Sequence, residues 1–502
     1  MQHPAPDWFR NALLRRWWWL PLVPAAFFAL FWRLGALPLQ MWDESRQAVN
    51  AAGMLGSGNW LVTQYQAEPD LWNTKPPLEV WLQALSLRTF GYSEWALRLP
   101  NALAALLLTV LVAAFARRWL GGRLAGLLAG LALLASKGFV GDHLARSGDF
   151  EPLLVLMTTA QVMAVFGWLQ TRQRRFLLLA GVAVALALLT KSVAGLFLVP
   201  GLAVEVIRRG RLLSLLRQPA AWMALVLALG PPALWYLARE QAGPGYLEAV
   251  WQNELGGRLL GSIEAHDEAW YWYLISFVSQ KFLLWTPWVL LAGWQLARRP
   301  AARPAHRFFT LAAWAGGVFM LLISLARTKL AWYDAPLYPL LALVLGGGLT
   351  LLVRRTARAA RTSGRRRWLP ATIVLLALVP SVIALHSRLN KEYKRRYNQA
   401  QLTYGRYLRQ LDGVPLPARR YTALHAGSDQ STLFYNAPLE YYALEARQAR
   451  RDTVMVVYGA ENLLPPGTLV VVCGRAAQRA LAQGRQFRVV HQADSCSTVR
   501  VE

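Results

Sequence analysis

LQMWDESRQAVNAAGMLGSGNW (residues 39–60) and NTKPPLEVWLQALSLRTFGYSEWALRLP (residues 73–100) form the stretch around which the chain is organised. The first segment places Asp43 and Glu44 beside Arg46, and the second places Lys75 directly before two prolines. Both groups of charges lie outside the long apolar runs, each at the start of an amphipathic helical pattern. We interpret residues 38–100 as a candidate active-site loop that the surrounding apolar runs hold at a membrane.

Long apolar runs account for most of the remaining chain. A helix needs about 20 mostly apolar residues to cross the hydrocarbon core of a bilayer. Residues 1–387 therefore predict a polytopic α-helical membrane domain with about eleven transmembrane helices. The predicted spans are 17–37, 98–116, 124–140, 152–170, 177–190, 193–207, 220–238, 275–295, 308–326, 335–353 and 368–387.

The charge pattern predicts the orientation of these spans. The chain of 502 residues is 55% hydrophobic and carries a net charge of +27. A basic stripe with interleaved aromatics, as in nucleic-acid-binding proteins, does not occur, so we expect no nucleic-acid partner. The basic residues instead cluster in alternate links between apolar runs, which the positive-inside rule assigns to the cytoplasm. The loop 38–100 then lies on the opposite, extracytoplasmic side.

Composition changes after the last apolar run. Residues 388–502 are polar and contain short β-branched runs at 453–457, 469–472, 487–490 and 498–501, with a helical pattern at 475–483. These patterns predict a small soluble α/β domain, which an odd number of spans places outside the cytoplasm. Cys473 and Cys496 then lie in an oxidising compartment, where they either form a disulfide or remain unpaired structural cysteines.

Asp43 and Glu44 are the candidate catalytic carboxylates of the first loop. A helix starts at Asp43 and is predicted to run to Gly56 or Gly58, so a helix N-cap is the alternative role for Asp43. One cap does not require two carboxylates and Arg46 beside an interfacial tryptophan. A carboxylate partly screened from water has the basicity to take a proton from an acceptor hydroxyl.

Lys75 is the candidate phosphate ligand. Proline favours the first helical turn, so a helix should begin at Pro76 or Pro77 and end at Gly91, with Leu78, Trp81, Leu82 and Leu85 on its apolar face. A cation at the positive end of a helix is unfavourable unless an anion is bound there. The alternative is a lysine that extends to the membrane interface.

Other outer loops supply further candidates, each with a structural alternative. Asp149 is either catalytic or a helix cap, and a cap is the better interpretation of Glu151. Lys191 is an isolated charge between two short apolar runs, which marks a functional candidate. Arg327 and Lys329 are two cations in an outer loop, where the charge bias predicts few basic residues. Such a pair suits a phosphate. Further substrate-binding candidates are Tyr333, Arg258 and His266, although His266 alone does not make a metal site.

Five segments resemble, in order, the ArnT-like glycosyltransferases of the GT-C group, which also includes protein O-mannosyltransferases. They are WDESRQAVNAAGMLGSGNWLV, NTKPPLEVWLQALSLRTFGYSEWALRLPNAL, ARSGDFEPLLVLMTTA, LALLTKSVAGLFLVPG and SLARTKLAWYDAPLYPLLAL. The similarity covers about residues 15–350. The resemblance implies a GT-C fold and a bacterial inner-membrane enzyme. On that resemblance Asp43 matches the essential acidic residue of the first loop, Arg46 its nearby arginine, Lys75 the lipid-phosphate lysine and Asp149 the acidic residue of a later loop.

Two positions depart from the family pattern. An acidic residue often precedes the KPP lysine, where this chain has Thr74, and Glu-His often stands where this chain reads Asn253-Glu254. The second departure leaves a divalent metal near that loop an open question. No nucleotide or metal is required for the expected reaction, because a polyprenyl-phosphate donor is already activated.

The expected reaction is inverting transfer of a sugar from a polyprenyl-phosphate donor to a hydroxyl of a glycan or lipid (lipid A-like) acceptor on the outer side of the membrane. The phosphate is bound by Arg46, Lys75, Arg327 and Lys329. A protein O-mannosyltransferase with a protein acceptor, a lipid-carrier flippase and a structural assembly protein remain alternatives.

Overall fold

The computed structural model divides the chain into two compact units. The structure describes residues 17–141, 143–260, 268–276, 281, 283–363, 368–397, 404–425, 435–450, 452–459, 464–482 and 486–502. The membrane unit comprises residues 1–32, 74–79 and 101–387. The loop-and-tail unit comprises residues 33–73, 80–100 and 388–502. We expected 38–100 to belong with the membrane domain, whereas most of this loop clusters with the C-terminal segment.

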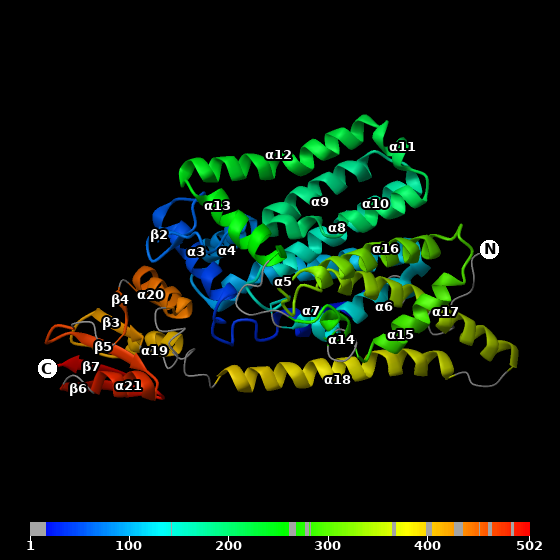
Figure 1. Ribbon diagram of the computed structural model, residues 1–502. Helices are drawn as coiled ribbons and strands as arrows, with labels where there is room; N and C mark the ends of the chain where they lie inside the picture. Colours follow the sequence, from blue (N-terminus) through cyan, green and yellow to red (C-terminus); the bar gives the residue numbers. More distant parts are fainter. Residues whose placement is uncertain are drawn as a thin grey trace. The chain divides into compact units, whose positions relative to one another are not determined.

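The chain is a multi-pass α-helical membrane protein (Figure 1). Within the described residues, seven helical segments are long and apolar enough to cross a membrane, and Leu22–Phe31 is a shorter apolar helix. The seven are Glu94–Leu134, Glu151–Thr171, Arg175–Leu196, Pro219–Ala242, Pro304–Leu325, Leu337–Ala360 and Leu369–Lys391. Helical structure occurs in every one of the predicted apolar runs, but several of these helices are too short to span alone.

The first of these segments contains two helices, α5 (Glu94–Ala116) and α6 (Gly122–Leu134), joined by a π-helical turn at Arg117–Gly121. Gly122 has φ +76°, a conformation that glycine adopts without steric cost. The spanning helices that follow are α8 (Glu151–Thr171), α9 (Arg175–Lys191), α12 (Pro219–Ala242), α16 (Pro304–Leu325), α17 (Leu337–Ser363) and α18 (Leu369–Tyr397).

Shorter elements complete the membrane unit. They are α2 (Leu22–Ala26) with the π-helical turn Phe27–Phe31, α7 (Lys137–Val140), the 3₁₀ turn Ser192–Leu196, α10 (Val199–Arg208), α11 (Leu212–Leu216), α13 (Tyr246–Val250), the π-helix Trp251–Leu260, α14 (Trp272–Ser276) and α15 (Thr286–Ala297). The turn Ser192–Leu196 interrupts the apolar sequence between α9 and α10, so this part of the chain bends directly after Lys191.

Small residues hold the centre of the membrane unit together. A Cβ atom at Gly346 of α17 would lie 2.7 Å from the Cβ of Ala129 on α6. A Cβ atom at Gly348 would lie 2.3 Å from the Cβ of Ala292 on α15. Close backbone approach through small residues is a main source of helix association in a bilayer, where lipid is as apolar as the helix surface. Helix α17 is accordingly a mostly buried, central helix.

The loop-and-tail unit is built on a five-stranded sheet of order β4-β3-β5-β7-β6. Strands β4, β3 and β5 are parallel, and β7 runs antiparallel to both β5 and β6. The strands are β3 (Arg420–His425), β4 (Thr453–Tyr458), β5 (Leu469–Cys473), β6 (Phe487–Ala493) and β7 (Cys496–Val501). Cys473 and Cys496 lie opposite each other on β5 and β7 and form a disulfide, which decides between the two alternatives for these cysteines.

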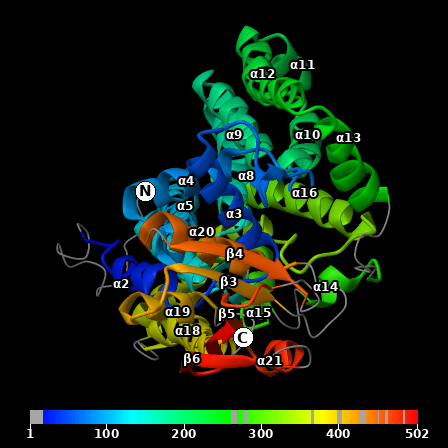
Figure 2. The same ribbon diagram turned by 90° about the vertical axis from the view of Figure 1, so that its left-hand side faces the viewer.

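Alternate residues of the sheet enter two different cores, as expected when successive side chains point to opposite faces. Leu424, Val470 and Val472 pack with α21 (Arg475–Ala482). Ala423 and Val471 belong to a larger core that also contains residues of α19 (Tyr404–Gln410) and α20 (Ala437–Arg450). Figure 2 shows α20 beside β3 and β4. The short 3₁₀ turn Leu411–Gly413 follows α19.

The same larger core includes two helices of the first loop, α3 (Asp43–Ser57) and α4 (Leu78–Phe90). Helix α3 lies against α20 and is followed by the two-stranded ribbon β1 (Gln64–Tyr65) and β2 (Glu68–Pro69). Glu94 joins the two segments, because it accepts hydrogen bonds from Tyr442 at 2.7 Å and from Arg409 at 2.9 Å. The first loop and the C-terminal segment are therefore one folding unit.

The apolar face predicted for α4 is only partly buried. Of Leu78, Trp81, Leu82 and Leu85, Leu85 is 50% exposed. The fully buried apolar residues of α4 are Val80, Ala84 and Leu87. Leucine suits a lipid environment as well as a protein core, so an apolar stripe in a membrane protein does not by itself identify the packed face.

Candidate functional site

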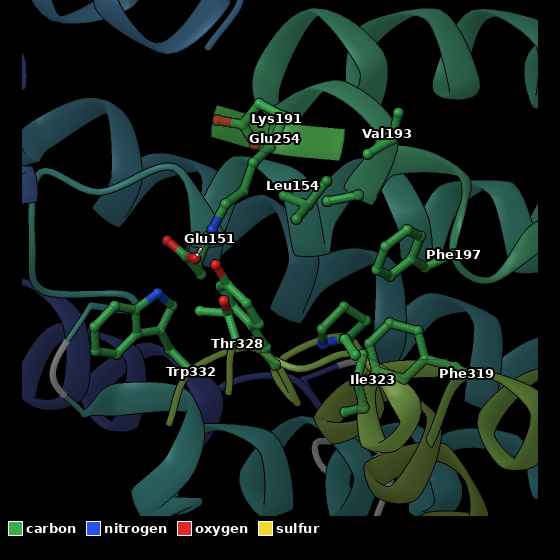
Figure 3. Close-up of a pocket in the computed structure, with 15 residues that line it drawn as sticks. Glu151, Leu154, Lys191, Val193, Phe197, Glu254, Phe319, Ile323, Thr328 and Trp332 are labelled. Atoms are coloured by element: carbon green, nitrogen blue, oxygen red, sulfur yellow. Dashed lines mark hydrogen bonds and ion pairs between the residues drawn. The ribbon is translucent and has the colours of Figure 1, made fainter. Parts of the chain in front are cut away.

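A pocket of about 160 Å³ opens in the membrane unit between α8, α9, α16 and the link that precedes α17. Its apolar walls include Leu154, Phe197, Phe319 and Ile323, and its polar groups come from Glu151, Lys191, Glu254, Thr328 and Tyr333. In Figure 3 the charged residues Lys191 and Glu151 lie on one side, whereas Phe197, Phe319 and Ile323 gather on the other. The pocket thus combines an apolar compartment with a charged end.

Lys191 and Glu151 form an ion pair in the wall of this pocket. Lys191 ends α9, Glu151 begins α8, and both residues are buried. The Lys191 ammonium also lies 5.1 Å from the centre of the Tyr333 ring, which adds a cation–π contact. The structure thus brings together two predicted substrate-binding residues, Lys191 and Tyr333. It also places Glu151 at the pocket, a position for which we had preferred a cap.

Lys75 is held by a second carboxylate of the same pocket. Its ammonium lies 2.8 Å from Oε1 of Glu254, which also accepts a hydrogen bond of 2.9 Å from the Thr74 hydroxyl. The Tyr246 hydroxyl in turn donates to the carbonyl of Thr74 at 2.7 Å. Burial raises the pKa of Tyr246, so this hydroxyl remains a donor at neutral pH. Lys75 therefore stands in a fixed position with the Glu254 carboxylate as a counter-ion.

Asp149 is a buried carboxylate just before α8. The Asn101 side chain donates to the backbone carbonyls of Ser147 at 2.7 Å and Asp149 at 2.6 Å, which fixes this loop. Nδ1 of His143 lies 3.1 Å from Oδ2 of Asp149. The His143 ring stacks on Trp332, a residue of the pocket wall, with centroids 3.5 Å apart. Asp149 is thus linked to the pocket through His143 rather than lining it.

The late basic block contributes a buried lysine. Lys329 is 6% exposed, and its ammonium donates to the carbonyl of Ala326 at 2.7 Å. Within the described part of the chain, no carboxylate lies at ion-pair distance from it. Arg327 is exposed, so it lacks the low-dielectric surroundings that strengthen an anion contact.

Asp334 lies at the end of the same link and is completely buried. Lys281 lies 2.7 Å from its Oδ2, and Tyr338 donates to its Oδ1 at 3.0 Å. Burial raises the pKa of Asp334 above its ordinary value, although the Lys281 charge opposes this shift. These contacts indicate a structural role in shaping the link before α17.

In the loop-and-tail unit, Glu44 is fully buried in an ion pair with Arg98. Nε of Arg98 lies 2.6 Å from Oε1 of Glu44, and Nη2 donates to Oε2 at 2.9 Å. The backbone amide of Gln40 also donates to Oε2 at 2.7 Å. Both carboxylate oxygens of Glu44 are thus occupied, an arrangement that favours a structural role over the predicted catalytic one.

Arg46 is paired in the same way with Asp70. Nε lies 2.7 Å from Oδ2 and Nη2 lies 2.8 Å from Oδ1. Burial alone would raise the pKa of Asp70, but the hydrogen bond and charge of Arg46 outweigh burial and hold it below its ordinary value. This bidentate pair neutralises Arg46, so its predicted role as a phosphate ligand gains no support from its surroundings.

Asp43 is the first residue of α3 and is half-buried. Trp42 occupies the N-cap position, and no side chain there makes a capping hydrogen bond. The cap alternative for Asp43 therefore has no support in the geometry. Of the other predicted residues, Arg258 lies on the π-helix Trp251–Leu260 but its side chain is outside the described part, and His266 lies outside the described residues altogether.

Sequence reasoning assigned no role to four residues that matter to these contacts: Glu254, Arg98, Asp70 and Asp334. Arg98 stands in an apolar helix, which is a usable signal, but the partner of each of the four is remote in sequence. The Glu254 carboxylate is already bonded to the Lys75 ammonium and to the Thr74 hydroxyl.

Comparisons with known proteins agree with the motifs. A family model described as dolichyl-phosphate-mannose-protein mannosyltransferase matches residues 74–236. Undecaprenyl phosphate-alpha-4-amino-4-deoxy-L-arabinose arabinosyl transferases are similar, with 28% identity over 378 residues in Edwardsiella ictaluri and 29% over 383 residues in Aeromonas salmonicida. These alignments cover 72% and 73% of this chain, and 66% of each relative's length.

The fold comparison extends over nearly the whole chain. The crystal structure of ArnT from Cupriavidus metallidurans bound to undecaprenyl phosphate superposes with a TM-score of 0.71, covering 96% of this chain and 98% of that one at 19% identity. The same protein in the apo state gives a TM-score of 0.67 at 18% identity, covering 96% and 97%. The chain therefore has the GT-C fold of ArnT, and the resemblance to ArnT-like proteins that its motifs predicted is confirmed.

Proposed function

We propose that this chain, with its ArnT-like GT-C fold, is an inverting membrane glycosyltransferase. It moves a sugar from a polyprenyl-phosphate donor to a hydroxyl of a glycan or lipid (lipid A-like) acceptor. The observation that carries the proposal is the pocket of the membrane unit, which joins apolar walls to a charged end. This is the combination that an amphipathic donor with a prenyl chain and a phosphate requires. The names of the relatives, which specify undecaprenyl phosphate-linked sugars, agree with it.

The donor phosphate binds to the lysines of the pocket region. Lys75 already contacts the Glu254 carboxylate and Lys191 the Glu151 carboxylate, so both ammonium groups are held in place before the donor arrives. The phosphate binds both ammonium groups alongside these carboxylates. Lys329 adds a third cation, whose described partner is the carbonyl of Ala326. The prenyl chain lies against the apolar walls that Phe197, Phe319 and Ile323 form.

The reaction needs a base and a stabilised leaving group. Asp43 takes the proton of the acceptor hydroxyl, whose oxygen attacks the anomeric carbon through an oxocarbenium-like state. The bond between that carbon and the phosphate oxygen breaks, and the phosphate leaves with the bonding electrons. Fixed cations at low dielectric stabilise the charge that develops on it. Attack on the face opposite the phosphate inverts the configuration at the anomeric carbon. If Asp43 is not the base, Asp149 is the next candidate.

Sidedness follows from the charge pattern. Basic links lie at the cytoplasmic ends of the helices, so the first loop and the C-terminal segment lie on the extracytoplasmic side of the bacterial inner membrane. The disulfide Cys473–Cys496 agrees with this assignment, because disulfides persist in oxidising compartments. Transfer then takes place on the outer side of that membrane.

A protein hydroxyl is the second candidate acceptor, because the matching family model is described as a protein mannosyltransferase. A lipid-carrier flippase is the alternative from another class. It requires an alternating pathway across the membrane, but no sugar transfer.

The test is transfer from a labelled polyprenyl-phosphate sugar to membrane acceptors in reconstituted membranes. Wild type, Asp43→Asn and Lys75→Ala are compared with two surface controls, Asp412→Asn and Arg88→Ala. Asp412 has a side chain that is 61% exposed, and Arg88 is exposed on α4. We expect Asp43→Asn to lose transfer, Lys75→Ala to weaken donor binding and both controls to match wild type.

The labelled product identifies the acceptor as lipid, glycan or protein. Full activity of Asp43→Asn would overturn the base assignment in favour of Asp149. If wild type transfers no sugar but moves the labelled donor across the membrane, the chain is a flippase instead.

A further inference from the structure

Trp42 is a large aromatic side chain placed directly before the proposed base and left 45% exposed. Its backbone has φ +73° and ψ −121°, a conformation that bulky residues rarely adopt. Strained backbone of this kind is retained where the surrounding structure holds it in place, often at functional sites. Here the Trp42 carbonyl accepts hydrogen bonds from the Ser45 hydroxyl at 3.1 Å and from the Arg46 amide at 2.9 Å.

One face of Trp42 is covered by a residue from the C-terminal segment. Tyr435 stacks on it with ring centroids 4.7 Å apart and an angle of 15° between the rings. Tyr435 also stacks on Tyr65 of β1, at 6.0 Å and 21°. Tyr435, which is remote in sequence, therefore covers one face of the indole and is itself held by Tyr65, while Trp42 as a whole stays 45% exposed.

The stack is backed by a rigid polar network. The Arg46 guanidinium lies 3.5 Å from the centre of the Tyr65 ring and is held by Asp70. The Asn50 side chain donates to Asp70 at 2.9 Å and accepts from Asn73 at 2.7 Å. Burial and hydrogen bonding of this kind fix side-chain positions before any ligand binds. The exposed indole is thus a preorganised surface rather than a mobile side chain.

We propose that the exposed face of Trp42 stacks on a sugar ring of the acceptor, and that Tyr435 holds the indole in position for it. A pyranose presents an apolar face of C–H groups, which complements the negative face of an aromatic ring. The Asp43 carboxylate interacts electrostatically with Tyr435, the residue stacked on Trp42, so a ring bound at Trp42 lies close to the proposed base. This inference rests on the proposed function and assigns the C-terminal segment a supporting role in acceptor binding.

The competing explanation is an interfacial tryptophan that contacts only lipid headgroups. The full chain in nanodiscs separates the two explanations with a binding measurement that needs no transfer. The probe is the deacylated headgroup of lipid A, a diglucosamine bisphosphate, and glycerol phosphate serves as an anion without a sugar ring. Variants are Trp42→Ala, the conservative Trp42→Phe, Tyr435→Leu, and Trp270→Ala as a matched control, because Trp270 is 70% exposed.

We expect Trp42→Ala to weaken headgroup binding and raise the acceptor KM about tenfold, with donor KM and glycerol phosphate binding unchanged. Trp42→Phe should recover most of the affinity, Tyr435→Leu should lose several-fold, and Trp270→Ala should match wild type. Equal losses for both probes, or headgroup binding unchanged in Trp42→Ala, would overturn the proposal. Failure of wild type to transfer sugar would instead overturn the proposed function, and the dependence of headgroup binding on Trp42 would still decide the sugar-ring site.

Discussion

The charged pairs of the membrane unit and those of the loop-and-tail unit look alike in sequence but differ in their surroundings. In the membrane unit, Glu151, Lys191 and Glu254 line a pocket. In the loop-and-tail unit, Glu44 and Arg98 are fully enclosed, and both oxygens of the carboxylate are bonded. A pair in a pocket wall can exchange a partner for a ligand, whereas an enclosed pair cannot. A catalytic-looking motif such as WDESR therefore mixes residues for chemistry with residues for folding.

The largest expected effect is on stability, from Arg98→Ala. Arg98 donates to Glu44 and also to the carbonyls of Leu34, Leu37 and Pro38. Its loss leaves Glu44 buried without a counter-ion, which should lower the free energy of unfolding by about 3–5 kcal/mol. Thermal unfolding of the purified protein in detergent measures this, with Arg88→Ala as the exposed control. A midpoint equal to wild type would show that the enclosed pair is not needed for the fold.

Asp70→Asn should cost about 1–3 kcal/mol, because the buried Arg46 loses its anionic partner. The change also tests a pH dependence. The pKa of folded Asp70 is lower than the unfolded value of about 3.9. The ionised Asp70 therefore contributes its full share of the free energy of unfolding above the unfolded pKa. This share is lost as the pH falls through the lower pKa of the folded state.

Unfolding midpoints of wild type and Asp70→Asn, measured from neutral pH down to about pH 3, should accordingly converge as the pH falls below about 4. Asp412→Asn, at an exposed aspartate, should keep the wild-type profile. A gap between wild type and Asp70→Asn that stays constant down to the lowest pH would contradict the assigned pKa shift.

Local signals in the sequence predicted individual elements well. Helix α3 ends at Ser57, next to Gly58 with φ +70°, and α4 ends at Phe90, next to Gly91 with φ +80°. The four β-branched runs became β4 to β7. Strand β3, which lies between β4 and β5, was missed because RYTALH has too little β-branched character to predict a strand.

Partners across long separations could not be predicted. Lys75 and Glu254 are 179 residues apart, and Arg98 and Glu44 are 54 apart. The sequence identifies Lys75 as a cation that needs an anion, but several acidic loops satisfy that requirement equally. Only the packing of remote helices selects Glu254. The stacking of Trp42 on Tyr435 has the same origin, since no local pattern connects the first loop with the C-terminal segment.

Glu254→Gln tests whether an ion pair in the pocket wall exchanges a partner for a ligand. The carboxylate competes with a donor phosphate for Lys75, so its neutralisation should tighten binding of polyprenyl phosphate by about three- to tenfold, or about 1 kcal/mol. Titration of the protein in nanodiscs measures the affinity, and Glu248→Gln on the neighbouring helix α13 is the control. Weaker binding in Glu254→Gln would mean that the carboxylate positions Lys75 for the phosphate and does not compete with it.

Thr74→Val should have the smallest effect. It keeps the side-chain shape and removes the hydroxyl that donates to Glu254 at 2.9 Å, while Lys75 remains bonded to the same oxygen. One lost hydrogen bond to a charged group that keeps another partner should change donor affinity by about 1 kcal/mol or less, in the same direction as Glu254→Gln. The double variant Thr74→Val/Glu254→Gln should then match Glu254→Gln alone, because the hydroxyl acts only through that carboxylate. Additive effects of the two changes would instead assign Thr74 a contact with the donor itself.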